Sequence, residues 1–180
     1  MVELQAKHAG IHALVERLPQ LEREHDFWMS GASRLAPGGA YRRVVRLVDG
    51  ALLNRYWDDL AIPRDEAYLE DRETAQGGAR PEAEVYRDLR AAAESGWDFS
   101  SRWLTDGALS STRTTDFLPV DLNSLLYKLE IVIARGCEAA RRPDCNRDMT
   151  ARALARKKAM LRLMWDEERG AFVDYDWRNE

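Results

Sequence analysis

The chain has 180 residues, of which 32% are charged, and its net charge is −4 at pH 7. This length is enough for one domain around one sizeable hydrophobic core. Because Asp and Glu slightly outnumber Lys and Arg, the charge gives no reason to expect nucleic acid or an acidic lipid surface as a partner. No apolar run approaches the length of a membrane span.

The first ten residues lack the basic start and the apolar centre of a signal peptide. We therefore expect a cytosolic protein, unless the true N-terminus lies upstream of this chain.

Cysteine and histidine residues give only weak signals for a metal site. Cys137 and Cys145 are the only cysteines, and their spacing matches no metal motif. Cys137 lies in a helical pattern, which favours a small buried thiol, although a disulfide stays open as an alternative. His8 and His12 could share a helix face, but no further metal-ligating pattern accompanies them. We expect these two and His25 to be surface histidines, with no metal bound.

The first predicted element is a helix. Apolar and charged residues recur at helical spacing from His12 to Met29. Pro19 interrupts the pattern and predicts a kink, or a break between two helices. Residues 30–40 are rich in Gly, Ser and Pro and are expected to form a loop.

A β-hairpin follows, and then a helix. Asp49 and Gly50 offer a tight turn between the apolar stretches 44–48 and 51–56. Pro63 is typical of a first helical turn, and the helix is predicted to run to about Thr74.

The next helix leads directly to the most informative segment. It is predicted to start at Pro81 and to end at Gly96, which suits a C-terminal cap. Asp98 therefore follows a helix end, in a loop held by a rigid element, where catalytic residues are common. Residues 106–116 are polar and are expected to be irregular.

Two further helices and a turn complete the chain. Asp121 can cap a helix over residues 122–141 that Pro143 ends, and residues 146–164 predict another helix. Arg169 and Gly170 predict a turn or a short hairpin. Since helices with hairpin-like loops recur, the pattern suggests a helical toroid, and the fold class is predicted as all-α with minor β-hairpins.

The stretch SGWDFSSRW carries the strongest functional signal. Asp98 lies between Trp97 and Trp103 and beside Phe99. An acid among aromatic walls has its charged form disfavoured by desolvation, which raises its pKa towards values useful for donating a proton. Because aromatic faces also suit sugar rings, we interpret Asp98 as a candidate general acid in a carbohydrate cleft. The two tryptophans fit core packing equally well.

Purely structural roles are the alternative interpretation of these charged residues. Asp98 could instead be a structural carboxylate that caps the loop or pairs with Arg102. Glu130 is expected to be a solvated helix residue. Asp174 and Asp176 could share a strand face, but we expect no second catalytic pair there.

Five stretches of this sequence, in chain order, carry a family resemblance. They are RVVRLVDGALLNRYWDD (43–59), PRDEAYLED (63–71), EVYRDLRAAAESGWDFSSRWL (84–104), STRTTDFLPVDLNSLLYKLE (111–130) and LMWDEERGAFVDYDWR (163–178). Together they resemble the bacterial α,α-trehalases of glycoside hydrolase family 37. The resemblance implies an (α/α)6 barrel that hydrolyses α,α-trehalose to two glucose molecules with inversion, without a metal or an organic cofactor. Such an enzyme would work in the bacterial periplasm or cytoplasm.

The resemblance also implies roles for four residues. The aspartate of the GWDxSSRW motif is the family's general acid, and here it is Asp98. Substrate contacts map onto Arg64, Glu66 and Gly96. Asp65 stands where the family commonly has proline, so the resemblance does not fix the local backbone there. Inverting hydrolysis needs a second carboxylate that deprotonates the attacking water on the opposite sugar face.

That second carboxylate has no counterpart in this sequence. The family's general base is a glutamate in a GGGGEY segment, which is absent, as are the motifs PGGRFREVYYWDSYF and QWDYPNGWAP. The stretch APGGAYRR (36–43) resembles the first of these motifs only superficially and is expected to be a surface loop. We therefore expect residues 1–180 to be a partial, single catalytic domain, a central fragment that is inactive by itself.

Two alternatives to an α,α-trehalase segment stay open. One is a non-catalytic helical module that binds sugar or a partner. The other is an (α/α)6 glycosidase that acts on a different glucoside. A truncated toroid would expose apolar faces, which favours self-association.

Overall fold

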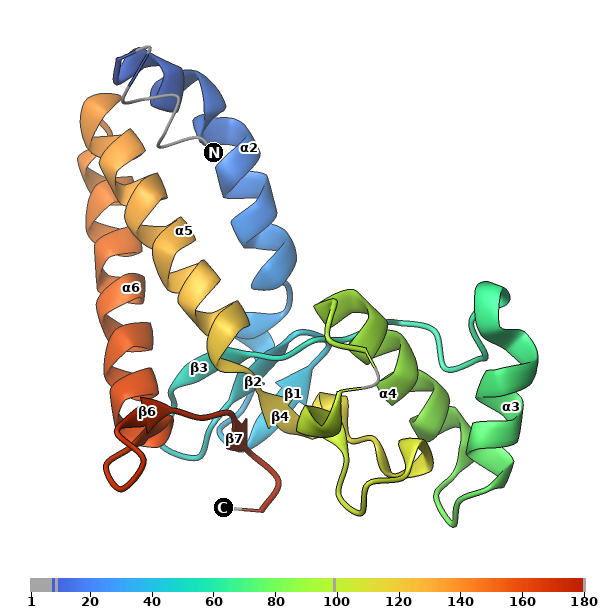
Figure 1. Cartoon of the computed structure of the whole chain (residues 1–180). Coiled ribbons are helices and arrows are strands. Elements are labelled where there is room, and N and C mark those ends of the chain that lie inside the picture. Colours follow the sequence, from blue (N-terminus) through green and yellow to red (C-terminus); the bar gives the residue numbers. More distant parts are fainter. Residues whose placement is uncertain (1–7, 9, 99, 180) are drawn as a thin grey trace.

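Helices predominate in the computed structural model, which describes residue 8, residues 10–98 and residues 100–179 (Figure 1). The α-helices of this part are α2 (His12–Trp28), α3 (Tyr68–Gln76), α4 (Glu82–Ser95), α5 (Val120–Ala139) and α6 (Pro143–Leu163). None of these helices is long and apolar enough to cross a membrane.

Short antiparallel strands connect the helices. A three-stranded sheet consists of β1 (Gly39–Tyr41), β2 (Val44–Arg46) and β3 (Leu52–Asn54). Strand β4 (Phe117–Leu118) pairs with β7 (Tyr175–Asp176), and β5 (Trp165–Asp166) pairs with β6 (Ala171–Phe172). Single 3-10 turns complete the list: η1 (Ala32–Arg34), η2 (Asp65–Ala67), η3 (Ser101–Trp103), η4 (Leu109–Ser111) and η5 (Thr114–Asp116). The prediction of a helical fold with minor β-hairpins is confirmed.

The helices form two groups (Figure 1). Helix α5 packs against both α2 and α6, and α3 packs against α4, with the three-stranded sheet between the groups. The α5–α2 contact depends on Gly136, because a Cβ there would lie 2.9 Å from Leu18 Cδ1. A larger residue at Gly136 would therefore require the buried Leu18 side chain to shift.

Several predicted boundaries change in the structure. Pro19 lies inside an uninterrupted α2, since Leu18 and Leu21 are buried against α5 and hold the helix together across the lost hydrogen bond. The expected loop 30–40 contains η1 and the start of β1. The helix expected from Pro63 begins at Tyr68, after η2, so it is shorter than predicted.

Both predicted turns are confirmed as hairpin turns. The backbone N–H of Leu47 donates to the carbonyl of Ala51 across Gly50, which has a φ of +88°. The second turn joins β5 and β6 through Gly170, with a φ of +60°. Glycine suits both positions because L-residues rarely adopt positive φ.

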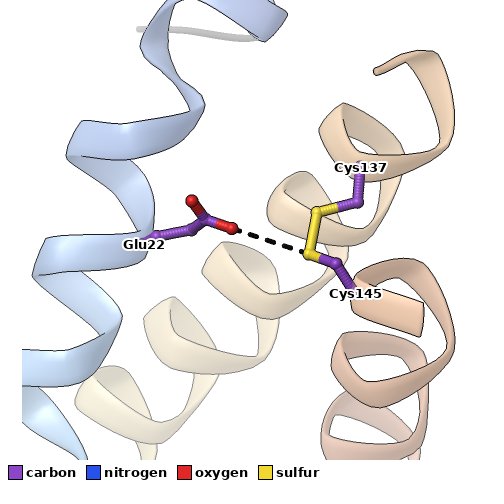
Figure 2. A group of neighbouring side chains, drawn as sticks. All are labelled: Glu22, Cys137 and Cys145. Carbon is purple, nitrogen blue, oxygen red and sulfur yellow. Dashed lines mark hydrogen bonds between the residues drawn. A yellow bond between two sulfur atoms is a disulfide. The ribbon is translucent and has the colours of Figure 1, made fainter. Parts of the chain in front are cut away.

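The favoured expectation for the cysteines is wrong, because Cys137 and Cys145 form a disulfide between α5 and α6 (Figure 2). Glu22 Oε1 from α2 lies 3.6 Å from Cys145 Sγ, along the dashed line in Figure 2. A disulfide sulfur carries no proton, so we interpret this approach as a contact and not as a hydrogen bond. The three side chains lie close enough to share a metal ion, but disulfide sulfurs offer no thiolate, so we assign no metal to them.

The expectations for Glu130 and His25 are also wrong, because both side chains are buried. Arg156 of α6 donates two hydrogen bonds to Glu130 Oε1, from Nη2 at 2.9 Å and from Nε at 3.1 Å. Its Nη1 donates to the side-chain oxygens of Asn54 at 3.0 Å and Asn123 at 2.8 Å. This buried polar network therefore joins α5, α6 and the end of β3.

Candidate active site

The loop that carries Asp98 starts at a sharp reversal after α4. Gly96 has a φ of +71° and caps the helix, as predicted. The Ser95 hydroxyl donates to the Ala92 carbonyl at 2.6 Å and accepts from the Trp97 backbone N–H at 2.9 Å. The Trp103 indole N–H donates to the Trp97 carbonyl at 3.0 Å. These bonds hold both sides of the Asp98 turn.

The expected aromatic walls around Asp98 are not formed by the residues described. Asp98 is exposed and Trp97 is 54% exposed, whereas Trp103 is fully buried. Trp103 packs edge-to-face on Tyr56, so it belongs to the core. Phe99, the third ring of the expected wall, lies outside the described residues. The two tryptophans thus separate into one core residue and one surface residue.

Arg102 is bound by two aspartates, neither of which is Asp98. Its Nη1 and Nη2 donate to Asp121 at 3.1 and 2.9 Å, and its Nη2 and Nε donate to Asp174. Its guanidinium also lies over the ring of Trp103, 4.5 Å from the centroid. The alternative in which Arg102 pairs with Asp98 is therefore wrong, and Arg102 instead ties the end of the loop to α5 and to the segment before β7.

Asp121 is not the helix cap that the sequence suggested. It lies inside the first turn of α5, whose N-cap is Pro119. Burial alone would raise the pKa of Asp121, but hydrogen bonds and the charge of Arg102 outweigh this, and the pKa is lowered. Asp174 also accepts from the Val120 backbone N–H at 2.9 Å, so it is part of the same structural network.

Arg64 is buried and is oriented by Asp71, a residue for which the sequence predicts no role. Asp71 Oδ2 accepts from the Arg64 backbone N–H at 2.8 Å and from Nε at 3.0 Å, while Oδ1 accepts from Nη2 at 2.7 Å. The separation of seven residues between Arg64 and Asp71 does not by itself predict this pairing, because the pairing depends on the irregular backbone between Arg64 and α3. Asp71 thus fixes the guanidinium plane.

Arg64 also lies within electrostatic reach of two carboxylates of the candidate site. The pKa of Arg64 is raised, first by the hydrogen bonds to Asp71, and then also by the negative charges of Glu66 and Asp98. Glu66 is exposed in η2, and Asp98 is exposed in the loop after α4. An oriented guanidinium and two accessible carboxyl groups can together donate to and accept from the hydroxyls of a sugar.

A comparison with protein families assigns the chain. The family model for trehalase matches residues 1–180, which is the whole chain. The chain belongs to the trehalase family. The helical fold with its small antiparallel sheets is consistent with part of a trehalase toroid. Trehalases are glycoside hydrolases, and membership supports a trehalose hydrolase-type function with trehalose as the substrate.

Proposed function

We propose that this trehalase-family chain carries the general acid of an inverting α,α-trehalase and part of its glucose-binding wall. In this proposal Asp98 protonates the glycosidic oxygen, while Arg64, Glu66 and Gly96 bind sugar hydroxyls. The general base is not among these 180 residues, so residues 1–180 form an incomplete catalytic domain that does not hydrolyse trehalose by itself.

The placement of Asp98 supports this proposal: although it is 34 residues from Arg64 in the sequence, the two side chains lie close enough for their charges to interact, as do those of Arg64 and Glu66. The accessibility of Asp98 supports it further, since an acid must reach the substrate oxygen. Arg102, the nearest arginine in the sequence, is already bound to two other aspartates. Asp98 is therefore not needed to neutralise it.

Hydrogen bonds from the sugar hydroxyls to such a wall would tighten as positive charge develops on the glucose ring. Asp71 contributes by holding Arg64, which leaves Arg64 less orientational freedom to lose on binding. Without the second carboxylate, no group of this wall deprotonates the water. Loss of general-base catalysis typically reduces the rate by about 10²–10⁴-fold.

The test combines binding and turnover on the 180-residue chain. We expect trehalose to shift the backbone amide NMR signals of Glu66, Gly96 and Asp98, with no glucose release above background. Asp98→Asn should weaken the response, whereas Asp106→Asn, at another loop carboxylate, should not. Shifts that spare these three amides would contradict the sugar-binding wall. Glucose release that is abolished by Asp98→Asn would contradict the proposal that the chain lacks the general base. Trehalose binding that is unchanged by Asp98→Asn would favour the non-catalytic sugar-binding module.

We also propose that the chain self-associates through exposed leucine side chains of α5 and α6. Leu154 and Leu161 are seven residues apart on one face of α6 and are 60% and 49% exposed, and Leu125 on α5 is 66% exposed. Exposed apolar side chains favour contact with a second copy of the chain. Light scattering should show a mass that rises with concentration and that Leu154→Glu lowers, whereas the control Leu69→Glu on α3 should not. A monomer at every concentration would contradict this.

A further inference from the structure

A polar hollow whose lining does not include Asp98 has a cavity volume of about 710 Å³. Its walls come from the segment after β3, from the N-terminal half of α4, from β1, from η5 and from the segment after β7. Its arginines are Arg55, Arg80, Arg87, Arg113 and Arg178. Five arginines face three carboxylates in this lining, which leaves two positive charges in excess. The volume is in the range of small-molecule sites.

The carboxylates of the hollow are already bound by three of its arginines. Asp88 accepts from Arg80 at 2.6 Å, and Arg80 also lies 3.7 Å from Glu84. Asp116 accepts from Arg113 at 2.8 Å and from Arg178 at 3.4 Å. The charge excess is therefore located on the two remaining arginines, Arg55 and Arg87.

Arg55 is a buried cation that donates hydrogen bonds to two neutral carbonyl groups. Its Nε donates to the Arg42 carbonyl and its Nη1 to the Thr115 carbonyl, both at 2.8 Å. Its exposure is 4%, and within the described part of the chain no carboxylate lies in ion-pair distance and Nη2 has no hydrogen-bond acceptor. Burial and then the charge of Arg178 lower the pKa of Arg55 to about 10. An anion beside it would offset both effects.

Arg87 is in a similar position. Its Nη1 donates to the Asp58 carbonyl at 3.0 Å, and across the residues described it has no ion pair with a carboxylate. Arg55 and Arg87 both lie against the ring of Trp57, with their guanidinium carbons 4.4 and 4.3 Å from its centroid. The ring holds both guanidinium groups in place, so their donors are ordered before any ligand arrives.

We propose that this hollow binds a phosphate group, free or as the monoester of a small molecule, between Arg55 and Arg87. A phosphate dianion matches the excess of two positive charges. Its several oxygens match the planar N–H forks of arginine, which bind phosphate in a bidentate manner. The volume leaves room for the organic part of a monoester beside the phosphoryl group.

Calorimetric titration of the 180-residue chain tests this, with inorganic phosphate, glucose 6-phosphate and uncharged glucose as probes. We expect saturable binding of at least one phosphate probe, which weakens in higher salt, and no heat from glucose that Arg87→Gln changes. Arg87→Gln should weaken it about tenfold or more, because it removes charge-assisted hydrogen bonds. Arg147→Gln, at an exposed arginine of α6, should leave it unchanged.

The two phosphate probes distinguish a site for the free ion from a site for a phosphate monoester. Tighter binding of glucose 6-phosphate identifies a monoester site, and equal or tighter binding of the free ion identifies a phosphate site. The indole N–H signal of Trp57 should shift with either probe, and Arg87→Lys should retain part of the affinity if Arg87→Gln disturbs the fold. Absence of saturable binding, or equal losses in Arg87→Gln and Arg147→Gln, would overturn the proposal.

Discussion

Replacing Glu130 with Gln is expected to lower the free energy of unfolding by about 3–5 kcal/mol, because it leaves the guanidinium of Arg156 buried without a countercharge. The two side chains are 1% and 2% exposed, so water cannot replace the lost partner. Urea unfolding at pH 7 measures the change. Glu138→Gln, on the exposed face of the same helix, is the matched control and should alter stability by no more than about 0.5 kcal/mol.

The effect of Glu130→Gln should also depend on pH. Burial alone would raise the pKa of Glu130, but the neighbouring His25 and the charge of Arg156 outweigh burial, and the pKa is lowered from its ordinary value of 4.5. A lowered folded-state pKa means that the stabilisation is fully present above about pH 4.5 and is lost as the pH falls through the folded value. The difference between wild type and Glu130→Gln should therefore shrink in acid, and a difference that is constant with pH would contradict this.

Replacing Asp71 with Asn should lower the free energy of unfolding by about 3 kcal/mol or more, because Arg64 would lose its buried ion pair. Three N–H groups of Arg64 donate to the Asp71 carboxylate, and the amide of Asn offers only one oxygen to accept them. The NH2 of the amide would face the donors of the guanidinium instead. Thermal and urea unfolding measure this change, with Glu70→Gln on the exposed face of α3 as the control.

Asp71→Asn also separates structure from sugar binding. If Arg64 is part of the glucose-binding wall, the Glu66 and Asp98 amides of Asp71→Asn should respond more weakly to trehalose than those of the wild type. This is measured under conditions in which the variant is still folded. An unchanged trehalose response, together with the expected loss of stability, would show that Asp71 supports the fold alone.

Local signals in the sequence predicted most of the secondary structure. The turns at Gly50 and Gly170 were predictable because positive φ favours glycine, and the end of α4 at Gly96 follows the same rule. Of the two alternatives at Pro19, the break between two helices is wrong, because the packing of α2 on α5 outweighs a local preference for a break. Such packing depends on residues more than 100 positions away.

Some features of the candidate site could likewise be predicted from the sequence, and others could not. The motif SGWDFSSRW singled out Asp98, and the resemblance added Arg64, Glu66 and Gly96, because these residues lie in short continuous segments. The partners of Arg102 and Glu130 could not be predicted from sequence: Asp174 is 72 residues from Arg102, and Arg156 is 26 residues from Glu130. The local sequence around an arginine does not indicate which carboxylate it will pair with in the folded chain.

The sequence by itself determined the trehalase family, the helical class and the identity of the candidate acid, because each depends on residue order and local periodicity. Only the tertiary structure decided that Cys137 and Cys145 are bonded, that Trp103 is core while Trp97 is exposed, and that Arg55 is buried with no carboxylate partner among the residues described. The physical reason is that burial and ion pairing are properties of neighbours in space. The chain brings those neighbours together only when it folds.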